Sequence, residues 1–72
     1  MNGRIIEPGS VLGVLGGGQL GAMFAGDARR MGYPIAVWDQ DPDAPAHHLA
    51  DHSFTASFSD SGAREEFSSL VR

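Results

Sequence analysis

Three consecutive glycines, Gly16–Gly18, separate two apolar patterns and limit the folds that are open to this chain. The preceding run, Ser10–Gly16, is rich in Val and Leu and lacks polar alternation, which is typical of a strand buried on both faces of a parallel sheet. From Leu20 onward the apolar residues recur at helical spacing, and Gly32 supplies a helix stop. The sequence therefore predicts a strand, a glycine turn and a helix in direct succession.

The predicted helix collects large apolar side chains on one face. The residues at this spacing are Leu20, Met23, Phe24, Ala28 and Met31. We expect Met23, Phe24 and Met31 to belong to the core rather than to a binding surface, because such a stripe normally holds a helix on its sheet.

Two further strands and a second helix follow. Residues 33–39 form an apolar run whose Pro34 belongs at its start, because proline lacks the amide that a central ladder needs. Residues 53–58 alternate enough for a third, more exposed strand, and "HHLAD" before them is consistent with one helical turn. The segment from Ser59 starts with N-capping residues and presents apolar positions on one face, namely Ala63, Phe67, Leu70 and Val71. Residues 5–9 read as a short lead-in with a turn at Pro8-Gly9.

The alternation of strands and helices predicts an α/β fold. Short connections imply three parallel strands joined by right-handed crossover helices, which is half of a Rossmann-like doubly wound domain. Seventy-two residues suffice for one small domain, with a limited core. Because three strands leave an open sheet edge, we expect this domain to lack a partner.

The glycine turn also matches a dinucleotide-binding fingerprint, Gly16-x-Gly18-x-x-Gly21, between a strand and a helix. The first glycine would permit a tight turn, the second would admit a ligand to the backbone, and the third would let helix and strand pack closely. Asp39 stands where a ribose-binding acid would follow. An NAD(P)-binding module of an oxidoreductase is therefore one hypothesis, and a turn that merely packs tightly is another. Gln19 and the crowded loop after Asp39 argue against a dinucleotide.

Several short motifs follow one another in a fixed order. They are Pro8-Gly9, Gly16–Gly21, Met31–Tyr33, Asp39, Asp41–Ala46 and Ala50-Asp51. In this order they resemble the amino-terminal segment of the 5-(carboxyamino)imidazole ribonucleotide synthase family, ATP-grasp ligases of purine biosynthesis, over most of residues 5–60. The chain departs from the family pattern at Ala22, where Arg is frequent, at Gln40, where Pro is common, and in its "HHL" segment.

The resemblance implies that residues 1–72 form a single domain of the preATP-grasp type, without the ATP-grasp and carboxyl-terminal domains. The family's enzymes use ATP to activate bicarbonate as carboxyphosphate, and the amine of aminoimidazole ribonucleotide then takes up the carboxyl group. ATP and magnesium would be bound outside this segment, so that no cofactor is expected in this chain. The segment alone would not catalyse the reaction.

By analogy with related ATP-grasp enzymes, the resemblance also implies that the glycine turn faces the acceptor substrate. It assigns substrate binding to Gly18, Gln19, Leu20 and Gly21, with Asp39 and Asp41 as weaker candidates. These groups would orient the ribonucleotide, and no catalytic or metal-binding residue is expected. The partner would be the remainder of the enzyme or a second copy along the sheet edge, and the parent enzyme would be a homodimer.

Composition narrows the remaining function classes. The net charge is −4 and the chain has no basic stripe, which disfavours a nucleic-acid partner. The longest apolar stretch is far shorter than a membrane span, and the absence of cysteine is consistent with a cytoplasmic location. His48 and His52 have a metal-compatible i, i+4 spacing, yet a solvated polar loop is the favoured interpretation of the three histidines, His47 included.

Overall fold

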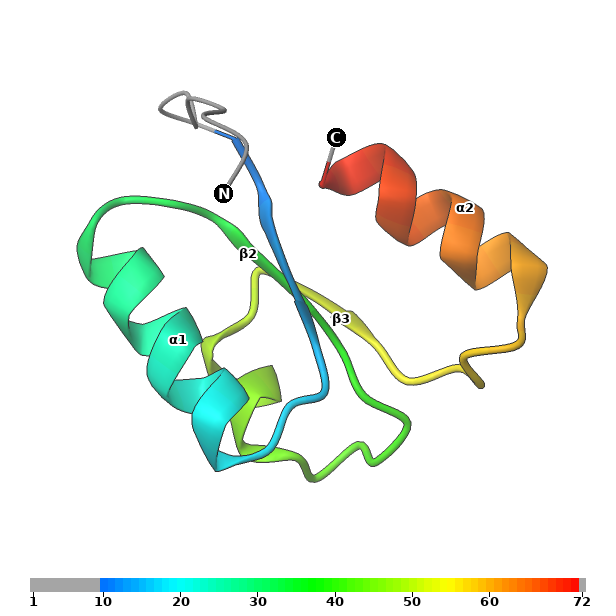
Figure 1. The fold of residues 1–72 in the computed structure, drawn as a ribbon, viewed down its shortest axis with the longest axis horizontal. Coiled ribbons are helices and arrows are strands. Elements are labelled where there is room, and N and C mark those ends of the chain that lie inside the picture. Colours follow the sequence, from blue (N-terminus) through cyan, green and yellow to red (C-terminus); the bar gives the residue numbers. More distant parts are fainter. Residues whose placement is uncertain (1–9, 72) are drawn as a thin grey trace.

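A computed structural model describes residues 10–71 of the chain, so the predicted lead-in at residues 5–9 lies outside them. The elements in chain order are β1 (Leu12–Leu15), α1 (Gln19–Arg30), β2 (Ile35–Trp38), the 3-10 helix η1 (Pro45–Leu49), β3 (His52–Phe54) and α2 (Ser61–Leu70), as Figure 1 shows. The predicted α/β order of strands and helices is therefore confirmed. No helix within residues 10–71 is long and apolar enough to cross a membrane.

The three strands form one parallel sheet with β2 in the middle. Leu12 of β1 stands opposite Ile35 of β2, and Ala36 of β2 stands opposite His52 of β3. All four residues of β2 are buried, as expected for the central strand of a sheet covered on both faces.

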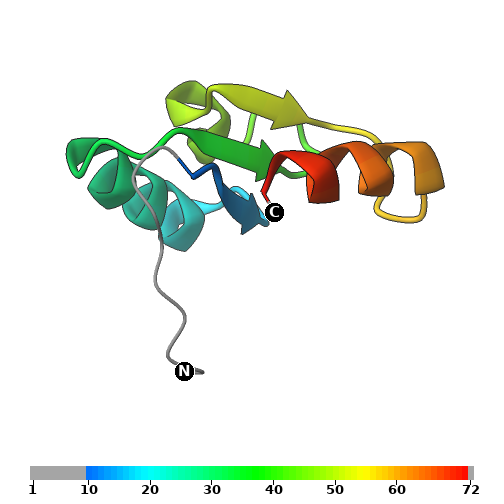
Figure 2. The ribbon, with the colours of Figure 1, turned by 90° about the horizontal axis from the view of Figure 1, so that it is seen from above.

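The alternating side chains of β2 serve two separate cores. Ile35 and Val37 face α1 and η1, where they join Ala25 and Ala28. Trp38 faces α2 on the opposite side of the sheet, where it contacts Phe67. Seen from above, α1 and α2 therefore lie on opposite sides of the sheet (Figure 2). This arrangement brings the carboxyl ends of the strands, and the turns that follow them, to one edge of the domain.

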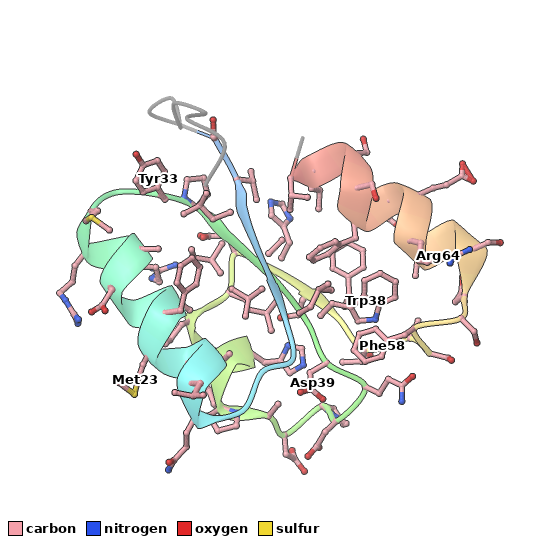
Figure 3. All side chains as sticks on the ribbon, viewed as in Figure 1. Met23, Tyr33, Trp38, Asp39, Phe58 and Arg64 are labelled. Carbon is pink, nitrogen blue, oxygen red and sulfur yellow. The ribbon has the colours of Figure 1, made fainter. Side chains whose placement is uncertain are left out.

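The prediction for the apolar face of α1 was wrong. Ala28 is buried as expected, but the large residues of the stripe are exposed: Leu20, Met23, Phe24 and Met31. Figure 3 shows Met23 pointing away from the sheet. Alanines contact the sheet instead because α1 approaches it closely, and large side chains would not fit between them.

Two expectations about the strands also needed correction. Only Val14 of β1 is buried, so this strand is not covered on both faces, and Leu15 is 69% exposed. β3 occupies residues 52–54 rather than 53–58. The predicted end of α1 is confirmed, since Gly32 has φ +91°. The predicted cap of α2 is confirmed as well, because the Asp60 side chain accepts a hydrogen bond from the Ala63 amide at 2.9 Å.

Candidate substrate site at the glycine turn

The first and third glycines of the fingerprint shape the turn after β1. Gly16 has φ +88°, a backbone conformation that side-chain-bearing residues rarely adopt, and its amide donates to the Trp38 carbonyl at 2.9 Å. A Cβ on Gly21 would lie 2.4 Å from the Gly16 carbonyl oxygen and 3.2 Å from Val14 Cγ1. The predicted tight turn and close helix–strand contact are therefore both present.

The middle glycine, Gly17, is buried and holds the turn against two other segments. Its amide donates to Asp39 Oδ2 at 2.6 Å, and its carbonyl accepts from the Ala46 amide at 2.9 Å. A Cβ there would lie 3.1 Å from Ala44 Cβ. The fingerprint assigns no role to this position, so sequence reasoning missed it. The available signal was that three glycines in a row include one more than the fingerprint needs.

Asp39 ends β2 and uses both of its carboxylate oxygens within the protein. Oδ1 accepts from the Asp41 amide at 2.8 Å, and Oδ2 accepts from Gly17. These two backbone hydrogen bonds, that of Asp41 first, hold the pKa of Asp39 below its ordinary value, and nearby His47 acts in the same direction. Asp39 therefore stays ionised and organises the turn from within (Figure 3).

Asp41 lies beyond this turn in the exposed loop. Its Oδ1 accepts from the Asp43 amide at 2.9 Å, which orders the loop locally. His47 lies beside the same turn, and its Nε2 donates a hydrogen bond to the Asp39 carbonyl oxygen, 3.1 Å away, while its buried Nδ1 has no hydrogen-bond partner in the described structure.

The start of α1 presents uncapped backbone amides to solvent. Gly18 is the N-cap, in an extended conformation, and no side chain caps the helix. The first main-chain bond of the helix is donated by Ala22 to the Gly18 carbonyl, so the amides of residues 19–21 precede the hydrogen-bonded ladder. A Cβ on Gly18 would meet nothing within 4 Å, and Leu20 is 81% exposed. This arrangement suits an anionic or strongly polar ligand.

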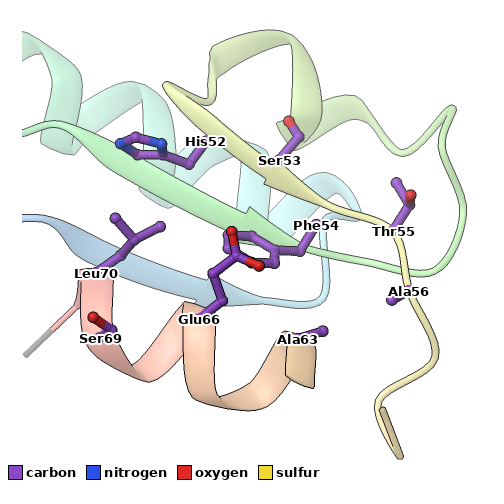
Figure 4. Close-up of a pocket in the computed structure, with 9 residues that line it drawn as sticks. All are labelled: His52, Ser53, Phe54, Thr55, Ala56, Ala63, Glu66, Ser69 and Leu70. Carbon is purple, nitrogen blue, oxygen red and sulfur yellow. The ribbon is translucent and has the colours of Figure 1, made fainter. Parts of the chain in front are cut away.

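The structure thus divides the six predicted site residues into three groups. Gly18, Gln19 and Leu20 are exposed together at the start of α1, whereas Gly21 and Asp39 face the inside of the turn and Asp41 lies in the loop beside it. A hollow of about 660 Å³ lies elsewhere, between β3 and α2 (Figure 4). Within residues 10–71 no three His, Asp or Glu side chains gather as a metal site.

Comparison with known proteins identifies the kind of domain that carries this turn. The family model of the ribonucleotide synthetase preATP-grasp domain matches residues 10–72. The chain belongs to this family. The preATP-grasp domain is 48% identical over 60 residues to the N5-carboxyaminoimidazole ribonucleotide synthase of Bacillus subtilis. These 60 residues make up 83% of this chain and 16% of that enzyme. It is 38% identical over 66 residues to the same enzyme of Staphylococcus haemolyticus, 92% of this chain and 18% of the relative.

Solved structures agree with the sequence relatives. An ADP complex of an N5-carboxyaminoimidazole ribonucleotide synthetase superposes with a TM-score of 0.87 at 42% identity, over 96% of this chain and 18% of that one. The N5-carboxyaminoimidazole synthetase of Staphylococcus aureus superposes with a TM-score of 0.88 at 34% identity, and the match covers 97% of this chain and 19% of that one. The preATP-grasp domain thus spans less than a fifth of these relatives. They are synthetases, which favours the ligase interpretation of the fingerprint over an oxidoreductase and confirms the family resemblance.

Proposed function

We propose that this chain is the amino-terminal preATP-grasp part of an N5-carboxyaminoimidazole ribonucleotide synthase and that it positions the acceptor, aminoimidazole ribonucleotide. The parent reaction is the ATP- and bicarbonate-dependent carboxylation of that amine in purine biosynthesis. The observation that carries the proposal is the open, uncapped start of α1 in a chain whose relatives bear this enzyme's name. ATP and magnesium belong, in this proposal, to the part of the longer synthases that this chain does not span.

The geometry supports a positioning role for each group. The amides of Gln19, Leu20 and Gly21 and the helix dipole attract the negative charge of a ribonucleotide, while the Gln19 amide side chain can donate and accept hydrogen bonds. Asp39 acts through the turn, because its carboxylate holds Gly17 in place. Orientation of this kind contributes by holding the amine where it reacts, without proton transfer. The homodimeric parent and the cytoplasmic location remain parts of the proposal.

Titration calorimetry of the chain with aminoimidazole ribonucleotide, ATP with magnesium, NAD and NADP tests this function. We expect heat from the ribonucleotide alone. In Gly18→Asp the new carboxylate caps the free amides and repels the ligand, so that affinity falls about tenfold or more while thermal stability is kept or raised. Gly18→Ala is the matched control, since its methyl enters open space and leaves the amides free.

Three other outcomes of these measurements would each contradict a different part of the proposal. Binding of NAD or NADP in preference to the ribonucleotide would restore the oxidoreductase hypothesis. Ribonucleotide binding that is equal in Gly18→Asp and Gly18→Ala would exclude the start of α1 as the site. Turnover of ATP by this chain with bicarbonate and the ribonucleotide would contradict the division of labour with the rest of the enzyme.

A further inference from the structure

His47 is half-buried, whereas the other two histidines, His48 and His52, are exposed. The interpretation of all three as a solvated polar loop therefore does not hold for His47. Its ring lies in η1, and Nε2 donates to the Asp39 carbonyl oxygen at 3.1 Å, while Nδ1 is buried without a hydrogen-bond partner among residues 10–71. Because the partner of Nε2 is an acceptor, the neutral ring carries its proton on Nε2.

The short 3-10 helix η1 depends on contacts with the rest of the domain, because so short a helix forms few internal hydrogen bonds. Ala46 is buried, and its amide donates to the Gly17 carbonyl at 2.9 Å. Towards the other end of η1, the Arg29 guanidinium donates to the Leu49 carbonyl at 3.1 Å. The His47 ring adds the contact that holds η1 to the end of β2.

The hydrogen bond from Ala46 sets the direction of the peptide group between Gly17 and Gly18. This peptide is trans, so its C=O and N–H groups point in opposite directions. Since the Gly17 carbonyl points to η1, the Gly18 amide points away from η1. Gly18 is exposed, and its amide makes no hydrogen bond within residues 10–71. The Gly18 amide is therefore a further free donor beside those of residues 19–21.

Asp39, which follows β2 (Figure 3), connects the His47 ring to the same turn by a second route. Its carbonyl accepts from His47, and its side-chain Oδ2 accepts from the Gly17 amide at 2.6 Å. The amide of Gly17 is thus held by the end of β2 and its carbonyl by η1, the two segments that His47 joins. Without the ring, η1 would separate from β2 more often, and the bond between Ala46 and Gly17 would open with it.

We propose that His47 is a positioning residue for the acceptor site. By holding η1 against the end of β2, it keeps the Gly18 amide aimed at the ligand together with the amides of residues 19–21. A donor that is already held in one direction binds more tightly, because less freedom is lost on binding. His47 lies in residues 47–49, where this chain departs from the family pattern. The identity of the ligand rests on the proposed function, while the geometry of the turn does not.

Amide side chains at position 47 separate the contributions of the two ring nitrogens. The amide nitrogen of glutamine stands at the same number of bonds from Cβ as Nε2, whereas that of asparagine corresponds to Nδ1. His47→Gln should therefore keep the hydrogen bond to the Asp39 carbonyl, and His47→Asn and His47→Ala should lose it. His48→Ala is the matched control, because the neighbouring ring is exposed and makes no hydrogen bond within residues 10–71.

Amide hydrogen exchange by NMR, in the full 72-residue chain, tests the turn without a ligand. We expect exchange at Ala46 to become about tenfold faster, relative to the amides of α2, in His47→Ala and His47→Asn but not in His47→Gln or His48→Ala. A general loss of stability would instead accelerate exchange in α2 as well. Nitrogen NMR of the His47 ring should show the proton on Nε2. Calorimetric titration should show an affinity for aminoimidazole ribonucleotide about fivefold lower in the alanine and asparagine variants and restored by glutamine.

Several results would overturn the proposal. One is exchange at Ala46 that His47→Ala accelerates no more than exchange in α2. Another is a ring proton on Nδ1, or an asparagine variant that behaves like the glutamine variant, because either would exclude Nε2 as the donor. A third is an unchanged ribonucleotide affinity in His47→Ala although the turn opens. If the original chain binds no ribonucleotide, the proposed function fails, and the exchange rates still decide whether His47 holds the turn.

Discussion

Gly21 and Gly26 lie in the same helix, and replacing each with alanine should change stability in opposite directions. A Cβ on Gly26 would lie 3.8 Å from the Arg30 guanidinium and 3.9 Å from Leu49 Cδ1, which is ordinary van der Waals contact. Alanine is favoured over glycine within a helix by about 0.8–1.0 kcal/mol. We therefore expect Gly26→Ala to raise the free energy of unfolding by about 1 kcal/mol.

At Gly21 the same methyl meets the backbone. Its Cβ would lie 2.4 Å from the Gly16 carbonyl oxygen, and Gly16 itself is held in a left-handed conformation. Overpacking costs about 1–3 kcal/mol, and more when backbone must move, so it exceeds the gain in helix propensity. We expect Gly21→Ala to lower the free energy of unfolding by about 2 kcal/mol.

The two variants should thus differ by about 3 kcal/mol, which corresponds to at least about 10 °C in the midpoint of thermal unfolding for a domain of this size. Urea unfolding, followed by Trp38 fluorescence and by far-ultraviolet circular dichroism, measures the difference. The m-values should stay equal if only the native contacts change. Equal stability of the two variants, or a Gly21→Ala variant as stable as the original chain, would refute the close approach of α1 to the turn.

Phe67, which packs against Trp38, and Asp39 at the glycine turn provide two further predictions. Phe67 is 7% exposed, and its ring centroid lies 5.3 Å from that of Trp38. Phe67→Leu should therefore lower the free energy of unfolding by about 1–2 kcal/mol and shift the Trp38 fluorescence. An unchanged urea midpoint would contradict this packing. The pKa of Asp39 is lowered by hydrogen bonds from the Asp41 and Gly17 amides, so its stabilisation is present above the ordinary value of 3.8 and is lost as the pH falls through the lowered folded value. Asp39→Asn should therefore be less stable near neutral pH and lose less stability on acidification, as thermal melts across pH 2–7 would report; parallel pH profiles of the two proteins would exclude this role.

Local chemistry made much of the fold predictable from the sequence. The glycine turn, the stop at Gly32 and the cap of α2 depend on residues within a few positions of one another, and all three are present in the structure. The central strand was recognisable because it is apolar throughout. Family motifs, which combine many such local signals in order, predicted the preATP-grasp domain that the comparisons identify.

The orientation of α1 was not available from the sequence. Helical periodicity shows which residues share a face, but it does not show which face meets the sheet. The contact at Gly21 brings α1 so close to β1 that alanines face the sheet, and the larger Met23, Phe24 and Met31 remain exposed. The exposure of Leu15 likewise depends on which strand lies at the edge, a property of the assembled sheet.

Asp39 illustrates the same division within the candidate site. Its place after the second strand follows from the sequence alone, because the apolar run ends there. Its hydrogen bond to Gly17, a residue 22 positions away, exists only because parallel pairing of β1 and β2 brings their carboxyl ends together. The sequence by itself determined which residues form the turn, and the tertiary structure decided that Gly17 and Asp39 hold it closed while Gly18 and Gln19 stay open to a ligand.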